Sequence, residues 1–266
     1  FGSSVQVSPD SQSFNVRAVF DTNANKVIVV WRNSGAGAIQ ARVATVSGTT
    51  LSVGSATTIH TSVNAYSDLD ATFDTNSNRV VVFARESNGI TEAFVGTVSG
   101  TSISFGTPVV FESDALREIG STFDSTNNKV IVTYRRTTDD KGYAKVGTVS
   151  GSSISFGSRA LFSGTLTGSN SRATFDSNSN KVVVAYSVLG GNGYASVGTV
   201  SGTSISFGTP VKFLDGNVIA TQRHLMAIAF NSTTNTVSIF VAGNGSVTTG
   251  TVSGTSITFD TPLVIL

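Results

Sequence analysis

The chain has 266 residues, 12% of them charged, and a formal net charge of +1, so neither nucleic acid nor a membrane surface is indicated as a partner. Cysteine is absent, which excludes disulfide bonds and thiolate metal sites. No apolar run is long enough to cross a bilayer, and we expect no membrane insertion.

The first seven residues, Phe1–Val7, match the end of a repeat found further along the chain, at Phe105–Phe111. We therefore expect them to be part of a preceding repeat, either truncated or used to seal a ring. The chain starts without an initiator Met or a signal-like segment, so we also expect it to have been processed or cut from a longer protein.

Two sequence motifs recur through the chain. Val-Ser-Gly triplets begin at steps of 51 or 52 residues, within a motif that reads GTVSGTSISFGTP at both Gly96–Pro108 and Gly198–Pro210. A second motif, FDTNANKVIVV from Phe20, has a counterpart in each of the other four copies. A regular period of this size is typical of propellers and other repeat arrays. We expect a single domain with repeats at approximately 13–62, 63–113, 114–164, 165–216 and 217–266.

Four strand-like runs make up each repeat. In the second repeat they are Asp68–Phe73, Arg79–Glu86, Ile90–Val98 and Ile103–Phe111. The second run is almost wholly apolar, as in a strand that is buried on both faces. The fourth run contains Gly106 and Pro108, which are typical of an edge strand or a bulge.

This pattern predicts an all-β fold, a five-bladed β-propeller with four-stranded antiparallel blades. The first run of each repeat would line the axis, and the fourth would lie at the rim. The ring would close between the repeats beginning at Val16 and Ile228. The phenylalanine that ends each first run should face the core of its blade; these residues are Phe20, Phe73, Phe123, Phe175 and Phe230.

An Asp-x-Asn-x-Asn motif follows the first run at Asp21–Asn25, Asp74–Asn78 and Asp176–Asn180. Alternating oxygen side chains of this kind can bind calcium. The motif lacks the Gly and the Glu that complete an EF-hand loop, and one carboxylate supplies little charge. We therefore favour a tight turn in which Asp and Asn hydrogen-bond to their own backbone.

The repeated VSGTSISFGTPVVF-type units resemble repeats of structural, tail-associated proteins of marine bacteriophages. The resemblance covers all five copies, and it implies a virion or extracellular appendage with other virion or appendage proteins as partners. It brings no catalytic signature. The architecture is also similar to that of five-bladed propeller lectins, in which equivalent pockets recur blade by blade.

The connections at the two ends of the blades differ in variability. The turns between runs one and two, and between runs three and four, are nearly constant. The other connections vary in length and chemistry, as in Ser87–Gly89 against Thr137–Lys141, or Glu112–Glu118 against Leu214–His224. Loops on a rigid scaffold commonly carry recognition, so we expect a ligand at this variable end.

Aromatic and basic residues favour the same end. The only Trp, all five Tyr including Tyr66, and the histidines His60 and His224 map there. Planar rings and guanidinium groups suit the face and the hydroxyls of a sugar. The alternative is that the rings fill the blade margins, with each Arg stacked over a neighbour. The predicted ligand-binding residues are Trp31, Arg32, Arg85, Tyr134, Arg135, Tyr143, Tyr186 and Tyr194.

Polar residues of the first runs would point into the axial channel. Their charges have opposite signs, so they could hold a ligand or a metal, although an ion-pair network around water is more common. These residues are Asn15, Arg17, Asp68, Asp70, Glu118, Asn170 and Arg172, with Leu225 in the last repeat.

The sequence favours a non-catalytic surface-recognition module that binds carbohydrate or another cell-surface polymer, with no catalytic residue, cofactor or metal. The alternatives are a structural or assembly repeat domain and a five-bladed glycosidase. Only Asp68, Asp70 and Glu118 have the position that a glycosidase would need, and the chain contains no G-x-S-x-G motif. We expect the protein to be extracellular or on a virion surface.

Overall fold

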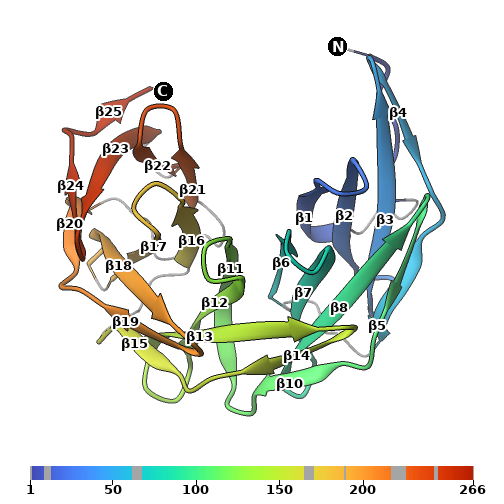
Figure 1. Cartoon of the computed structure of the whole chain (residues 1–266), viewed down its shortest axis with the longest axis horizontal. Coiled ribbons are helices and arrows are strands. Elements are labelled where there is room, and N and C mark those ends of the chain that lie inside the picture. The colour runs from blue at the N-terminus through green and yellow to red at the C-terminus, as the bar shows by residue number, and fades with distance from the viewer. Residues whose placement is uncertain are drawn as a thin grey trace. The chain divides into compact units, whose positions relative to one another are not determined.

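Two compact units make up the chain in the computed structural model. Unit 1 comprises Phe1–Ala115 with Val149–Ser155, and unit 2 comprises Leu116–Thr148 with Phe156–Leu266. The structure describes residues 2–8, 13–61, 68–164, 171–188, 190–216, 226–242 and 245–265 (Figure 1). Every regular element in these ranges is a β-strand, so they contain no helix long and apolar enough to span a membrane. The prediction of an all-β chain is confirmed.

Unit 1 holds two antiparallel sheets, one for each of the first two repeats. The first three strands of a repeat lie in sequence order, and two short strands pair with the outer edge of the third. Sheet 1 consists of β1 (Ser13–Asp21), β2 (Lys26–Asn33), β3 (Ala38–Ser47), β4 (Thr50–Val53) and β5 (Thr57–Thr61). Sheet 2 consists of β6 (Leu69–Asp74), β7 (Arg79–Arg85), β8 (Thr91–Ser99), β9 (Ser102–Phe105) and β10 (Val109–Glu112).

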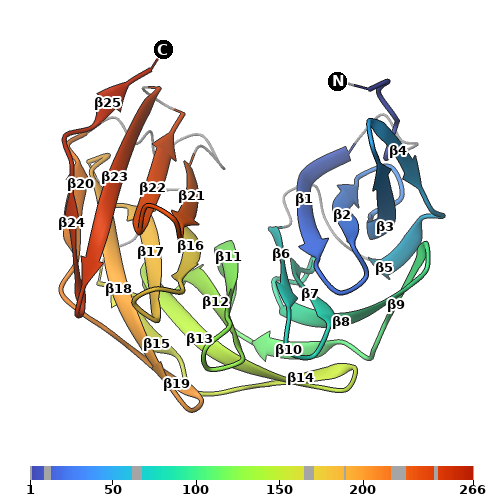
Figure 2. The same cartoon turned by 45° about the horizontal axis from the view of Figure 1, so that its top comes forward.

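Unit 2 holds most of sheet 3 and all of sheets 4 and 5, which follow the same plan. Figure 2 shows the first three strands of sheet 5 side by side. Sheet 3 consists of β11 (Leu116–Asp124), β12 (Lys129–Arg136), β13 (Lys141–Ser150), β14 (Ser153–Phe156) and β15 (Ala160–Ser163). Sheet 4 consists of β16 (Ser171–Asp176), β17 (Lys181–Ser187), β18 (Gly193–Ser201), β19 (Ser204–Phe207) and β20 (Val211–Leu214). Sheet 5 consists of β21 (Met226–Asn231), β22 (Thr236–Val241), β23 (Ser246–Ser253), β24 (Ser256–Phe259) and β25 (Leu263–Val264).

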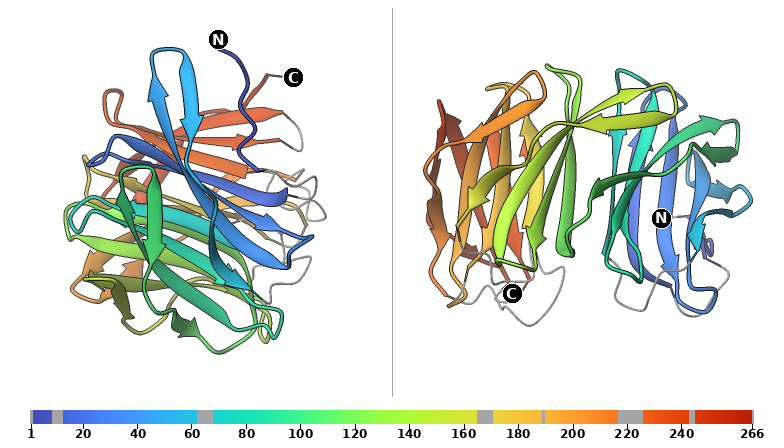
Figure 3. Two further views of the ribbon diagram at one scale, coloured as in Figure 1. Left: turned by 90° about the vertical axis from the view of Figure 1, so that its right-hand side faces the viewer. Right: turned by 90° about the horizontal axis from the view of Figure 1, so that it is seen from below.

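The outer strand of each sheet is broken in two. Figure 3 shows the strands from two further sides. In sheet 2, β9 and β10 both pair with β8, and the amide of Gly106 between them donates to the carbonyl of Val95. Gly54, Gly157 and Gly208 make the equivalent hydrogen bond in sheets 1, 3 and 4. Each repeat thus forms one four-stranded blade with an interrupted edge, as the Gly and Pro of the motif predict. Closure of the blades into a five-membered ring remains a prediction.

The turn after the first strand is fixed by its leading Asp or Asn. In sheet 2, Oδ1 of Asp74 accepts hydrogen bonds from the amides of Asn76 and Ser77, both at 2.9 Å. Asn78 then adopts a φ of 54°, in the left-handed region that Asn tolerates. The same bonds form in the other turns, which are led by Asp21, Asp124, Asp176 and Asn231. The predicted tight turn, in which the leading side chain hydrogen-bonds to the backbone of its own turn, is confirmed.

The second strand of each sheet forms the centre of the core. In β17, Val182 and Val184 join one buried cluster, while Val183 and Ala185 join another. Successive side chains of a strand point to opposite faces, so β17 is buried on both sides. This confirms the reading of the apolar second run in repeat four.

The phenylalanines that end the first strands are unequally buried. Phe73 is 8% exposed and belongs to the core of unit 1. Phe123, Phe175 and Phe230 are partly buried. Phe20 is 51% exposed, so the expected core position is corrected for this residue: nothing within unit 1 covers that side of β1 at Phe20.

In each of the first four repeats, a glycine of the outer strand lies against a turn of the following repeat. A Cβ at Gly54 would overlap the carbonyl oxygen of Thr101, and one at Gly157 would overlap that of Thr203. No side chain fits in this space, which explains why the motif requires glycine here. Gly2 makes the same approach to Thr49, while the assignment of Phe1–Val7 to a preceding repeat remains a prediction.

Candidate functional site

The predicted ligand-binding residues lie where the second strand of a sheet pairs with the third. Tyr134 pairs with Tyr143 in sheet 3, and Tyr186 pairs with Tyr194 in sheet 4. Trp31 takes the equivalent place in sheet 1. The predicted set is divided between the units, with Trp31, Arg32 and Arg85 in unit 1 and Tyr134, Arg135, Tyr143, Tyr186 and Tyr194 in unit 2.

Three of the predicted aromatic rings are buried. Trp31, Tyr134 and Tyr186 are 1%, 0% and 1% exposed. The Tyr186 hydroxyl lies 3.1 Å from Oγ of Ser196, and burial raises the pKa of Tyr186. The expectation that these three rings face a ligand is therefore corrected. They fill the margins of their sheets, which is the alternative that the sequence left open.

The predicted arginines are held within the fold. Arg32 is 2% exposed, and burial lowers its pKa. Its Nε and Nη1 have no hydrogen-bond partner within the described part of the chain, and its guanidinium lies 5.8 Å from the centre of the Phe14 ring. Arg135 places Nε 3.1 Å from Oε1 of Glu118 and Nη1 2.9 Å from Oδ1 of Asp140. Arg85 is partly buried.

Tyr143 is partly exposed, but charged side chains surround it. The guanidinium groups of Arg136 and Arg159 lie 5.1 Å and 5.3 Å from the centre of its ring. Its hydroxyl donates to Oδ2 of Asp139 at 2.8 Å. The hydrogen bond from Arg136 holds the pKa of Asp139 well below its usual range, while burial and Asp139 raise the pKa of Tyr143. A sugar would have to compete with two guanidinium groups for this ring.

Tyr194 borders an open pocket. Its ring stacks on that of Tyr186, with 6.3 Å between the ring centres and 21° between the planes. The pocket has a volume of about 210 Å³ and is lined by Ser163, Gly164, Tyr186, Val188, Tyr194 and Pro210. Its lining combines two tyrosine rings, Val188 and Pro210 with the polar Ser163, and no carboxylate belongs to it. Among the predicted residues, Tyr194 combines a partly exposed ring with an adjacent cavity.

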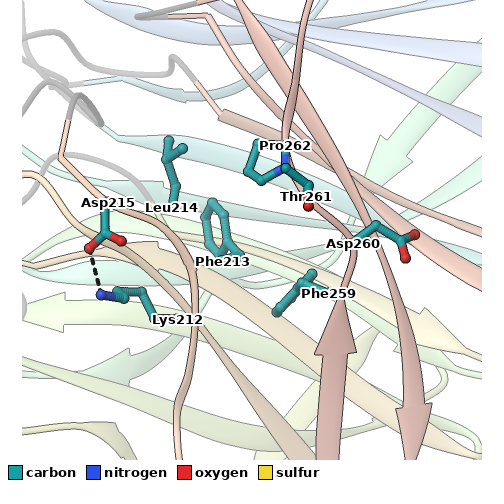
Figure 4. Close-up of a pocket in the computed structure, with 8 residues that line it drawn as sticks. All are labelled: Lys212, Phe213, Leu214, Asp215, Phe259, Asp260, Thr261 and Pro262. Atoms are coloured by element: carbon teal, nitrogen blue, oxygen red, sulfur yellow. Dashed lines mark hydrogen bonds and ion pairs between the residues drawn. The ribbon is translucent and has the colours of Figure 1, made fainter.

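A larger pocket, of about 430 Å³, lies between outer strands of sheets 4 and 5 (Figure 4). Lys212 and Asp215 form an ion pair at 2.5 Å on one side, and the Phe213 and Phe259 rings lie 5.6 Å apart. Lys212 pairs with Tyr194 across β18 and β20, but the two pockets share no lining residue. Sequence analysis did not indicate this pocket, because part of its lining, Phe259–Pro262, comes from the repeated outer-strand motif of the next repeat.

Polar residues of the first strands form ion pairs within each unit. Nε of Arg17 lies 2.8 Å from Oδ1 of Asp70 in unit 1, and Glu118 pairs with Arg135 in unit 2. Glu118 has a φ of 61°, which is uncommon for a residue other than glycine. These pairs agree with the predicted ion-pair network. Of the remaining positions, Asp68 is buried, Asn15 and Arg172 are partly buried, and Asn170 and Leu225 lie outside the described residues.

His60 lies beside two carboxylates that sequence analysis did not connect with it. Its Nε2 is 3.3 Å from Oε1 of Glu86, and its Nδ1 is 3.8 Å from Oε2 of Glu92. Comparison of the repeats could have singled out Glu92, because the other repeats carry a different residue at the equivalent position. Those residues are Gln40, Tyr143, Tyr194 and Ser246. Tyr66 and His224 lie outside the described residues.

No protein-family model matches the sequence, and no curated protein is significantly similar to it. Solved structures do resemble it. AofleA from Arthrobotrys oligospora has a TM-score of 0.61 and 10% identity, covering 93% of this chain and 74% of that chain. The six-bladed β-propeller lectin of Aleuria aurantia, a fucose-recognising protein, has a TM-score of 0.59 and 16% identity, covering 93% and 78%. A proposed 6-phosphogluconolactonase from Bacteroides uniformis has a TM-score of 0.61 and 12% identity, covering 93% and 71%. At these identities the likeness shows the fold alone.

Proposed function

We propose that the chain is a non-catalytic carbohydrate-binding module whose site is the Tyr194 pocket. The observation that carries the proposal is a partly exposed aromatic ring beside a cavity of about 210 Å³. A tyrosine ring offers a flat apolar face to the C–H groups of a sugar and a hydroxyl at its edge. The buried Tyr186 supports the ring from behind, so little conformational freedom is lost on binding.

The lining of the pocket favours a sugar with an apolar substituent. Val188 and Pro210 contribute an apolar wall, which would suit the methyl group of a 6-deoxy sugar. A mutant of the Aleuria aurantia lectin has a solved structure in complex with methyl α-L-fucoside, a sugar of this class. Fucose-containing glycans are therefore the first ligands to test.

We expect one such pocket in the chain and not five equivalent ones. The position of Tyr194 is occupied by a different kind of side chain in most other repeats, and Tyr143 is engaged by Arg136, Arg159 and Asp139. A sugar stacked on the single ring of Tyr194 should bind weakly, with a Kd of about 1 mM for a monosaccharide.

The surroundings of the acids argue against glycosidase chemistry. Such enzymes use two carboxyl groups on opposite sides of the bond that is cleaved. The Tyr194 pocket has no carboxylate in its lining, Asp70 pairs with Arg17, and Glu118 pairs with Arg135. Incubation with fucosylated glycans and with 6-phosphogluconolactone should release no product. Turnover of either would overturn the non-catalytic proposal.

The position outside a cell or on a virion, the bacteriophage resemblance and the assembly role remain predictions from the sequence. They do not affect the test of the pocket.

A glycan array probed with the parent chain and with Tyr194→Ala should show a set of glycans that only the parent retains. Tyr143→Ala is the matched control, because that residue has the same place in the neighbouring sheet. Equal retention of the same glycans by the parent and Tyr194→Ala would overturn the proposal.

A further inference from the structure

A histidine and two glutamates from adjacent sheets of unit 1 meet at one point. His60 comes from β5 of sheet 1, Glu86 follows β7, and Glu92 lies on β8 of sheet 2. Each can place one ligand atom within 4.8 Å of the other two. Donor atoms around a tetrahedral ion with bonds of about 2.1 Å are about 3.4 Å apart, so small side-chain adjustments would suffice.

The three side chains are positioned by ordered neighbours. Nδ2 of Asn88 donates to Oε2 of Glu86 at 2.7 Å, and the amide of Ile90 donates to Oδ1 of Asn88 at 2.9 Å. The ring of His60 packs against Phe94, with 5.5 Å between the ring centres. Contacts of this kind, from residues that touch the ligands and not the ion, orient the ligands of metal sites.

Two of the ligand atoms make only long contacts: Nε2 of His60 lies 3.3 Å from Oε1 of Glu86, and Oε2 of Glu92 lies 3.8 Å from Nδ1 of His60. Nε2 of His60 and Oε2 of Glu92 are buried and have no hydrogen-bond partner in the described ranges. Glu86 and Glu92 are neighbouring, largely buried carboxylates on either side of His60. Adjacent buried carboxylates repel one another when both are charged. A divalent cation would neutralise the charges of both carboxylates and could bind Nε2 of His60 and Oε2 of Glu92.

We propose that His60, Glu86 and Glu92 bind a divalent transition-metal ion, for which Zn²⁺ is the probe. Imidazole with carboxylates suits Zn²⁺, whereas Ca²⁺ and Mg²⁺ prefer oxygen ligands alone. Three protein ligands leave a fourth position open to water or to an oxygen of a ligand. The ion would join sheet 1 to sheet 2.

The other repeats show that the fold accepts different residues at these places. Position 60 corresponds to Glu112, Ser163 and Leu214 in the following repeats, and position 92 corresponds to Gln40 in the first. The Tyr194 pocket includes the counterparts of all three ligands, which are Ser163, Val188 and Tyr194. His60→Ser and Glu92→Gln therefore introduce residues that the same position already carries elsewhere in the chain.

Calorimetric titration of the chelator-treated chain with Zn²⁺ should show one ion bound per chain, accompanied by a rise in Tm. His60→Ser and Glu92→Gln should each weaken binding by about tenfold or more, since even outer-sphere partners of a metal are worth that much. His224→Ser replaces the only other histidine and should bind like the parent. Ca²⁺ should not compete.

Absence of Zn²⁺ binding, or parental affinity in Glu92→Gln, would overturn the proposal. If His60→Ser does not fold, Glu92→Gln decides, because Gln40 shows that glutamine is tolerated at this position. The test is independent of carbohydrate binding: Tyr194 lies in unit 2, so Tyr194→Ala should leave Zn²⁺ affinity unchanged.

Discussion

Gly157 lies so close to the carbonyl oxygen of Thr203 that a Cβ at this position would overlap that oxygen. The same contact joins Gly54 to Thr101 and recurs at the other outer-strand glycines, so one short motif sets the spacing of successive sheets. Repeat five carries Asp260 at this position and cannot make the approach.

Replacing Gly157 by Ala should therefore destabilise unit 2. The added methyl group meets backbone, which cannot move aside as a flexible side chain can, and overpacking of this kind costs about 1–3 kcal/mol. Gly164→Ala is the control, because no atom of the described residues lies within 4 Å of the Cβ position there. Denaturant unfolding should show a clear loss for the first variant and a change within about 0.5 kcal/mol for the second. Equal effects would contradict the steric account.

The hairpin between β6 and β7 offers a comparison of core and turn. Phe73→Ala should cost about 3–5 kcal/mol, because the ring is 8% exposed and belongs to the core of unit 1. Asn76→Ala should cost under about 1 kcal/mol, because Asn76 is exposed and joins the turn through its backbone amide. Similar thermal shifts in both variants would show that the ring contributes little.

Ring closure can be tested on the exposed face of β1. Phe14, Val16 and Phe20 are 53%, 53% and 51% exposed in unit 1. In the closed ring that the sequence predicts, this face would be covered, and Phe20→Ala should cost about as much as Phe73→Ala. Val46→Ala, at a residue 56% exposed beside a constant turn, should change little. A loss of under about 1 kcal/mol for Phe20→Ala would contradict closure over this face.

Asp139 should contribute stability that disappears in acid. The hydrogen bonds from Arg136, the Tyr143 hydroxyl and the Lys141 amide hold the pKa of Asp139 below its usual range in the folded chain. The unfolded chain binds this proton more readily, so the contribution is present above the unfolded pKa of about 4 and is lost as pH falls below it.

Asp139→Asn should accordingly lower Tm at pH 7, and the difference from the parent should shrink toward pH 2.5. Asp215→Asn removes an exposed carboxylate that pairs with Lys212, and should have little effect at either pH. A difference between parent and Asp139→Asn that does not depend on pH would show that packing, not charge, explains the loss.

The repeat and its strands could be predicted because their causes are local. The Asp-led turn and the apolar second strand act within a few residues of sequence, and the Gly that meets a carbonyl of the next repeat recurs with the regular period. The burial of Trp31 and Tyr134 could not be predicted, because a ring at the end of a strand can either fill the margin of a sheet or face solvent. The position of His60 beside Glu86 and Glu92 depends on how the outer strand of one repeat meets the next, which no single repeat encodes.

The most direct test of the proposed function is a crystal structure of the chain with a glycan that is retained on the array. The account predicts one sugar residue with a C–H face on the ring of Tyr194 and its apolar substituent toward Val188 and Pro210. The same crystals of Tyr194→Ala should show no sugar in that pocket. A glycan bound at the Val-Ser-Gly turns, or one that remains in place in Tyr194→Ala, would contradict the account.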